Sequence, residues 1–171
     1  FGTSSILFGG KLKLSTEIAF SEFDTNPTNE FGEEADKAYR VTVDGMQDVA
    51  TLLASPVMVK LGAEYSYVGF SFRSPANPGI QPDREGYSLK KDTLWKIATL
   101  SVGFSTFNDN TDRLVLLPRT RTHTWNTGLT LAPPDLPSLT LNYSFGDQRS
   151  YYEPEDFGAK RLVERDRLEH M

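Results

Sequence analysis

The feature that most constrains this chain is an alternation of apolar and polar residues with a period of two. From Leu12 to Phe20, every second residue is Leu, Thr, Ile or Phe, and the residues between them are Lys, Ser, Glu or Ala. Successive side chains of a strand point to opposite faces, so this pattern predicts a strand with one apolar face. The alternation recurs in the segments 39–44, 57–67, 87–89, 98–105, 124–131 and 138–145. The sequence therefore predicts an all-β fold of about seven strands.

Several of these segments approach the roughly 9–11 residues that a tilted strand needs to cross a bilayer. We expect residues 1–150 to form an antiparallel up-and-down transmembrane β-barrel segment, and residues 151–171 to form a charged loop or short helical tail. A bacterial barrel normally has an even number of strands. Either the chain is a fragment that forms a curved meander sheet, or an eighth strand lies near residues 6–8.

The predicted connections between the strands alternate roughly between long and short. The long links are 25–37, 71–85 and 108–118, and the short links are 90–93 and 132–137. The link 45–56 is ambiguous, because its V-A-T-L-L-A piece could lengthen a strand or form a helical turn. Long external loops alternating with short periplasmic turns are typical of outer-membrane barrels.

The aromatic residues of the apolar face fall at one level when the long loops are placed at a common end. Successive antiparallel strands reverse direction, so the end of one strand and the start of the next share a rim. A membrane–water interface favours rings at one height, whereas a soluble core has no reason to sort them. We predict that nine residues form such a membrane-interface belt: Phe20, Tyr39, Tyr65, Tyr67, Tyr87, Phe104, Trp125, Tyr143 and Phe145.

Composition alone leaves a soluble β domain and a membrane barrel open. The mean hydropathy is mildly polar, which suits both, because a barrel strand averages an apolar and a polar face. A net charge of −5 with both signs interspersed argues against a nucleic-acid partner. The absence of cysteine leaves no disulfide and no thiolate metal site. No apolar run approaches the roughly 18 residues of a membrane helix.

The stretch from Phe72 to Phe145 carries a resemblance to a known class of proteins. It reads F-R-S-P-A-N-P-G-I-Q-P-D-R-E-G-Y-S-L, later L-W-K-I-A-T-L-S-V-G-F-S-T-F-N-D-N-T-D, and then T-R-T-H-T-W-N-T-G-L-T-L-A-P-P-D-L-P-S-L-T-L-N-Y-S-F. This order of loop and strand motifs resembles large bacterial outer-membrane β-barrel proteins, with related segments in gliding and secretion translocon barrels. The resemblance implies a β-barrel in the outer membrane and implies no particular substrate.

No constellation of residues predicts catalysis or a cofactor. The two histidines, His123 and His170, lie far apart in the sequence, and no serine lies in a G-x-S-x-G elbow. Gly9-Gly10 lacks the following Lys-Ser/Thr of a phosphate loop. We therefore expect a protein without enzymatic activity.

Three polar clusters admit a binding role beside a structural one. Four acidic residues could offer oxygen ligands to a divalent cation, although they lack the spacing of a calcium loop: Glu30, Glu33, Glu34 and Asp36. The segment 108–112 could also offer oxygen ligands to a cation, but the preference of turns for Asn and Asp explains these residues. Arg119, Arg121 and His123 project from one side of a strand, where they could meet lipopolysaccharide phosphates, line a pore mouth or form an ordinary polar rim.

The leading hypothesis is an outer-membrane β-barrel segment with a structural or transport role. Its expected partners are the lipid bilayer with lipopolysaccharide and further strands of the same polypeptide. Two alternatives stay open: a soluble β-barrel or sandwich domain that binds a lipid or sugar, and an outer-membrane barrel enzyme. The soluble alternative predicts folding without detergent, and the enzyme predicts acidic, His or Ser residues clustered at the outer rim.

Overall fold

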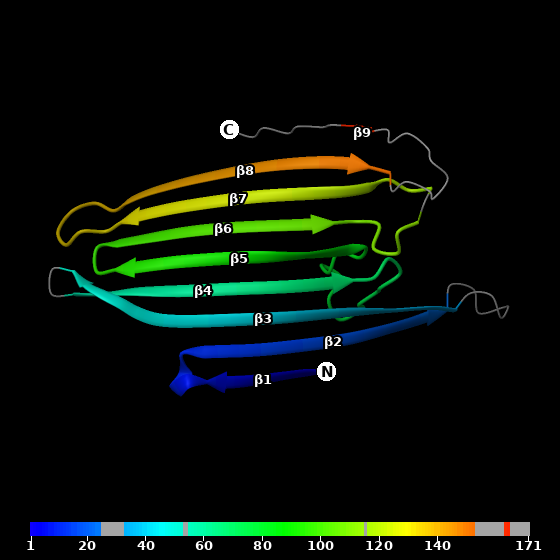
Figure 1. Ribbon diagram of the computed structural model, residues 1–171, viewed down its shortest axis with the longest axis horizontal. Helices are drawn as coiled ribbons and strands as arrows, with labels where there is room; N and C mark the ends of the chain where they lie inside the picture. The colour runs from blue at the N-terminus through cyan, green and yellow to red at the C-terminus, as the bar shows by residue number, and fades with distance from the viewer. Residues whose placement is uncertain (25–32, 53–54, 115, 153–162, 165–171) are drawn as a thin grey trace.

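The chain forms one antiparallel sheet in which each strand pairs with its neighbours in sequence (Figure 1). The computed structural model describes residues 1–24, 33–52, 55–114, 116–152 and 163–164. The strands are β1 (Gly2–Leu7), β2 (Leu12–Asp24), β3 (Glu33–Leu52), β4 (Ser55–Val68), β5 (Arg84–Trp95), β6 (Ala98–Asn108), β7 (Arg119–Leu131), β8 (Leu139–Tyr151) and β9 (Val163–Glu164). The predicted all-β, up-and-down architecture is confirmed, and the sheet is not closed, with β1 and β9 at its edges.

Two of the predicted links are wrong in their bounds. Residues 90–93 lie inside β5, where Lys91 pairs with Val102 of β6, and the chain turns at Lys96–Ile97 instead. The alternation in sequence breaks at this point because charged and polar residues occupy both faces, yet the backbone ladder continues. Similarly, β3 begins at Glu33, so only the earlier part of the predicted acidic loop remains a link.

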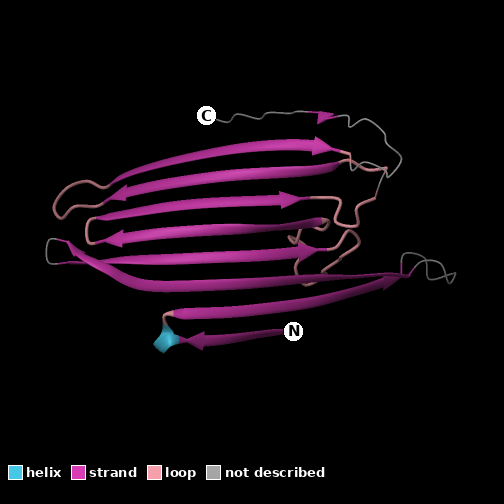
Figure 2. Cartoon of the chain, viewed as in Figure 1, coloured by secondary structure: helices cyan, strands magenta, loops and turns pink. Residues whose placement is uncertain are grey.

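The remaining ambiguities resolve in favour of strands. The uncertain link 45–56 lengthens β3 as far as Leu52, and β4 follows from Ser55. The segment near Ile6 belongs to β1, which pairs with β2 and ends in a 3-10 turn at Phe8–Gly10 (Figure 2). The link after β7 lies at 132–138, one residue longer than the predicted 132–137. In the expected tail, Val163–Glu164 pair with Ser150 and Tyr151 of β8.

The register joins the apolar sides of β2 to β8 into one continuous face. One row across the middle of the sheet runs from Ala63 through Leu89, Phe104 and Trp125 to Phe145. A one-residue slip in any strand would move its apolar side chains to the opposite face. The alternation in the sequence therefore places the apolar side chains of these strands on one common side of the sheet, the apolar face.

The opposite side, called here the polar face, is divided by charge. On β2 to β5 it carries charged residues of both signs, among them Lys13, Glu17, Arg40, Asp44, Lys60, Glu64, Arg84, Lys90 and Asp92. On β6 to β8 it carries Ser, Thr, Asn, Gln, Gly and one Phe, with no charged residue. The polar face thus has a charged wall and a neutral wall.

The described residues form a single layer with almost no interior. Phe72, in the link between β4 and β5, is the one apolar side chain among them that is buried, at 4% exposure. No helix or second sheet covers the apolar face in the described part of the chain (Figures 1 and 2). Among these residues, no helix has the length and apolarity needed to span a bilayer.

Candidate functional site

The nine aromatic residues singled out from the sequence all lie on the apolar face, and most of them contact one another across strands. Tyr39 of β3 stacks on Tyr67 of β4 with ring centroids 5.0 Å apart. Phe104 of β6 lies 6.0 Å from Tyr87 of β5 and 4.5 Å from Trp125 of β7. These rings form a belt across β3 to β8, completed in register by Phe145 opposite Trp125.

The belt is open to its surroundings. Several of its rings are among the most exposed apolar side chains of the sheet, with Phe20 71% and Tyr143 64% exposed. Aromatic pairs of this kind contribute about 0.5–1.5 kcal/mol beyond the area that they bury. The belt therefore stabilises strand pairing while it leaves ring surface available for contact with another phase or molecule.

A polar rim follows the belt on the same face, toward the loops. The structure places Arg119, Arg121 and His123 on one side of β7, as the sequence predicts. Arg119 is buried in an ion pair with Glu85 of β5. Arg121 donates from Nε to Asn108 Oδ1 at 2.8 Å, and the ring of His123 stacks on Phe104 at 6.1 Å.

Hydrogen bonds join the two described long links beyond this rim. The Asp83 carboxylate, at the end of the link 69–83, accepts from the backbone N–H of Asn110 at 3.0 Å and from that of Thr111 at 2.7 Å. The Asn110 side chain donates to the carbonyls of Leu114 and Leu117 and accepts from the Leu114 N–H, which shapes the link 109–118. The turn-forming role predicted for 108–112 matches these contacts.

Carboxylates gather where these links meet. Partial desolvation raises the pKa of Asp112, whose side chain is largely exposed, above its ordinary value, and the nearby carboxylates of Asp36 and Asp83 raise it further. All three belong to the loop end of the sheet. Among the described residues, no group of three or more His, Asp or Glu side chains is arranged to hold a metal ion.

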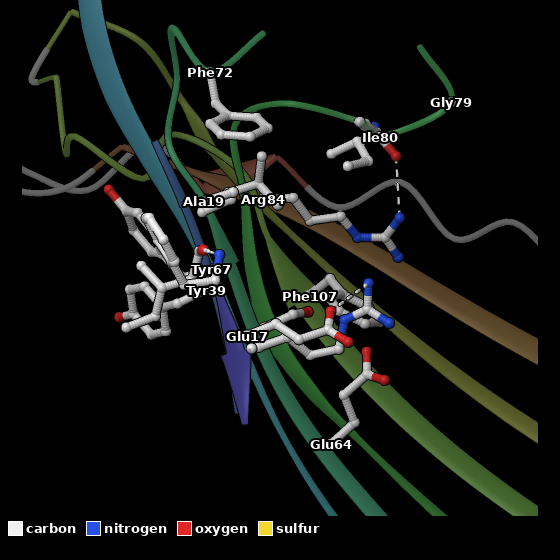
Figure 3. Close-up of a pocket in the computed structure, with 18 residues that line it drawn as sticks. Glu17, Ala19, Tyr39, Glu64, Tyr67, Phe72, Gly79, Ile80, Arg84 and Phe107 are labelled. Carbon is white, nitrogen blue, oxygen red and sulfur yellow. Dashed lines mark hydrogen bonds and ion pairs between the residues drawn. The ribbon is translucent and has the colours of Figure 1, made fainter. Parts of the chain in front are cut away.

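The link 69–83 folds over the polar face at this end of the sheet. The Asp36 carboxylate accepts from the Ser71 N–H at 2.8 Å, and Ser21 Oγ accepts from the Arg73 N–H at 3.1 Å. A side chain at Gly69 would meet the Asp36 carboxylate at about 2 Å, so a larger residue there would displace this carboxylate from its present position. The buried ring of Phe72 lies under this link, above Ala19 of β2 (Figure 3).

A pocket of about 730 Å³ opens between this link and the polar face. Its apolar end is made by Phe72 and Ile80, and Glu17 and Glu64 lie at its other end, with Arg84 between them (Figure 3). The Arg84 guanidinium lies 3.8 Å from the ring centroid of Phe107 and donates to Gln81 Oε1 at 3.0 Å. The pocket thus combines apolar, cationic and anionic walls.

Other residues singled out from the sequence do not gather into a site. Of the four acidic candidates, Asp36 accepts from the backbone N–H of Lys37 in β3 and from that of Ser71 in the link 69–83. Glu30 lies outside the described residues, and so do the side chains of Glu33 and Glu34. His170 also lies outside them. Gly9 and Gly10 adopt positive φ values of 65° and 90° in the 3-10 turn after β1.

Sequence reasoning missed the pocket and its residues. Phe72, Asp83 and Arg84 were assigned to a Pro- and Gly-rich loop, which carries no periodicity from which facing could be read. The one available signal was Q-P-D-R at 81–84, a turn sequence in which Asp tolerates the left-handed backbone that Asp83 adopts at φ 56°. No family model, curated protein or solved structure matches the chain.

Proposed function

We propose that this chain is a membrane-spanning segment of a bacterial outer-membrane β-barrel with a structural or transport role. The observation that carries the proposal is the continuous apolar face, which the described residues leave uncovered. Soluble monomers rarely expose apolar patches beyond a few hundred Å². On seven strands in register, Leu, Val, Ile and aromatic side chains point outward together. Acyl chains are the partner that fits a face of this extent.

The aromatic belt and the polar rim support the same orientation. Rings with a polar edge favour the membrane–water interface, and charged side chains favour the water beyond it. The belt separates an aliphatic zone, which includes Leu61, Leu100 and Leu129, from the rim at Arg119 and Arg121. We propose that the long links lie on the external side, where Arg121, the exposed arginine of the rim, meets lipopolysaccharide phosphates.

One charged residue stands within the aliphatic zone and is compatible with this proposal. Lys91 lies on the apolar face between Leu61 and Val102. It is close to the end of β5 at Trp95, which is the end opposite to the belt. A lysine near the end of a strand extends its ammonium to the interface while its methylene groups stay in the apolar layer.

The polar face is proposed to line the lumen. In lipid, each unsatisfied backbone polar group costs several kcal/mol, so a sheet edge must be paired. Among the described residues, β1 pairs with β2 alone, which leaves one side of β1 for another strand. Further strands of the same polypeptide would close the barrel and enclose the polar face.

Detergent dependence tests the proposal. The protein is refolded with and without micelles and followed by circular dichroism and by gel mobility before and after boiling. We expect a β-rich species that forms in micelles and migrates faster before boiling than after it.

A monomer that folds in buffer without detergent would overturn the membrane proposal. It would favour a soluble β domain, because a folded soluble monomer must cover the apolar face by itself. Analytical ultracentrifugation in buffer distinguishes such a monomer from an aggregate that hides the apolar face between copies.

A further inference from the structure

We infer that a second pocket on the polar face, toward the end of the sheet opposite to the aromatic belt, binds a small tetrahedral oxyanion with two charges, such as phosphate. The inference goes beyond the proposed barrel role and does not require the polar face to line a lumen. It rests on a local excess of positive charge in a chain whose net charge is −5.

This second pocket has a volume of about 300 Å³ and lies across the strands β3 to β5 and the turn before β2. Gly62 of β4 leaves space in it, because its partners in register are Asp44 and Lys90 and it has no side chain of its own. Four lysines and two aspartates line the pocket, which gives a formal charge of +2: Lys11, Lys13, Lys60, Lys90, Asp44 and Asp92.

One of the two carboxylates is already engaged by the wall of the pocket. Lys90 Nζ lies 3.0 Å from Asp92 Oδ2, and Ser101 Oγ donates to Asp92 Oδ1 at 2.6 Å. The Asp92 side chain is 18% exposed, whereas that of Lys90 is 66% exposed and has further N–H donors to offer. Asp92 therefore competes little with a bound anion.

The other carboxylate, Asp44, is outnumbered by lysines. Lys11, Lys13 and Lys60 are exposed, and none of them forms an ion pair within the part of the chain that the structure describes. Elsewhere on the same wall the charges are matched, as in the pair of Arg40 with Glu17. The positive charge of the pocket is therefore left for a ligand to compensate.

The arrangement of the lysines selects the chemical class of the anion. An ammonium is a compact point charge with three donors, and it imposes no planar geometry on its partner. The lysines approach from β2, β4, β5 and the turn before β2, so an anion with oxygens on all sides contacts several of them at once. A carboxylate offers two oxygens in one plane. Two charges on the anion match the formal excess of the pocket.

Calorimetric titration of the intact protein, in whichever medium keeps it folded, tests the inference. At about pH 8 inorganic phosphate carries two charges and the lysines remain protonated. Malonate supplies the same charge on planar carboxylates, and sodium chloride holds the ionic strength constant so that screening is equal. We expect saturable binding of phosphate and an affinity for malonate that is lower by about threefold or more.

Glycerol 3-phosphate, titrated in the same way, distinguishes two sources of the anionic group. We expect it to bind as well as inorganic phosphate does if the free ion is the ligand, and more tightly if the ligand is a phosphate ester. Weaker binding than that of malonate would contradict recognition of the phosphate group.

Variants of opposite sign test the role of charge. Lys13→Gln and Lys60→Gln should each weaken phosphate binding by about twofold to fivefold, as expected for exposed charges. Asp44→Asn should strengthen it by a similar factor, because it removes the remaining carboxylate, and damage to the fold would not produce such a gain. Lys37→Gln removes an exposed positive charge near the start of β3, outside the pocket, and should leave the affinity unchanged.

Three outcomes would overturn the inference. They are no saturable binding of phosphate at millimolar concentrations, equal affinity for phosphate and malonate, and an unchanged affinity for phosphate when Lys13→Gln and Lys60→Gln are combined. Circular dichroism verifies that each variant folds, and Asp44→Asn still decides if the double variant does not. Detergent dependence does not enter these outcomes, so failure here leaves the barrel proposal standing, and the reverse also holds.

Discussion

Asp83 is the residue that connects the two described long links. Its carboxylate accepts from two backbone N–H groups and from the Thr111 hydroxyl, and its backbone has a positive φ of 56°. An aspartate at such a position suits the left-handed backbone and offers both oxygens to the facing link. A single residue thereby joins β5 to the turn before β7.

Replacing Asp83 with Asn should destabilise the protein by about 1–2 kcal/mol, because one acceptor oxygen becomes a donor that faces an N–H group. The backbone conformation remains accessible to Asn. Asp135→Asn is the matched control, since Asp135 is exposed, also has a positive φ, of 61°, and forms no side-chain hydrogen bond with the described residues. Thermal unfolding of the two variants provides the comparison, and equal midpoints would contradict the role given to Asp83.

Asp112 should make the loop end sensitive to pH. Its folded-state pKa is raised above 3.8, so the folded protein retains a proton that the unfolded chain has already lost. This contribution to stability is present at low pH and is lost as the pH rises through the folded pKa. Asp112→Asn should therefore raise the free energy of unfolding slightly at pH 7, by about 0.5 kcal/mol or less for an exposed group, and leave it unchanged near pH 3. A larger gain in stability at pH 3 than at pH 7 would contradict a raised folded-state pKa for Asp112.

At the scale of residues, the sequence predicts the position of a side chain far better in a strand than in a link. Alternation places Trp125 and Phe104 on one face, and the structure brings their rings into contact. Phe72 stands in a segment without periodicity. Its neighbours Ser71 and Arg73 are held by hydrogen bonds to Asp36 and Ser21, more than thirty residues away. Nothing local in the sequence encodes those contacts.

The pairing of β5 with β6 depends on one glycine. A side chain at Gly86 would meet the Thr106 carbonyl oxygen at 2.0 Å and the Phe107 Cα at 2.8 Å. Both are backbone atoms, which cannot move without separating the two strands. This close approach also positions Phe107 near Arg84 at the pocket.

Gly86→Ala should consequently destabilise the protein by about 2–4 kcal/mol, because the added methyl overlaps the neighbouring strand. Gly103→Ala on the same face of β6 is the control, because its nearest neighbours lie at 3.9 Å and leave room for a methyl group. Chemical denaturation of both variants measures the difference. If the two substitutions cost the same, the close approach at Gly86 is not required for pairing.

At the scale of elements, strand existence follows from the sequence, and strand ends do not. Period-two alternation finds β2, β4, β6, β7 and β8, since each has one apolar side. It ends β5 too early at residue 90, because Lys91–Thr93 are polar while their backbone still pairs with β6. Hydrogen bonds between strands extend past the point where side chains cease to alternate.

The apolar face permits a test that separates lipid from water as its partner. Leu89 lies on this face in the middle of β5 and is 50% exposed, and its neighbour Ser88 points to the polar face. If the face contacts acyl chains, Leu89→Arg should cost about 2–4 kcal/mol in a bilayer, whereas Ser88→Arg should cost much less. Refolding into lipid vesicles across a denaturant series compares the two. Equal tolerance of both substitutions would place the apolar face outside the bilayer.

For the whole molecule, the sequence predicts the topology and leaves closure undetermined. Short turns and alternating faces are sufficient for an up-and-down order, which the structure shows. Whether an edge strand such as β1 pairs with a further strand is not determined by the alternation of its own side chains. The same pattern would suit a closed barrel or an open sheet.

The division of the polar face into two walls has a consequence for how ions in solution act on it. Fields from the charges on β2 to β5 fade over the Debye length, about 8 Å at physiological ionic strength and about 3 Å at 1 M salt. The hydroxyl and amide groups on β6 to β8 act through short hydrogen bonds, which salt hardly screens. Raising the ionic strength should therefore weaken binding of charged ligands at the charged wall and leave hydrogen bonding at the neutral wall unchanged.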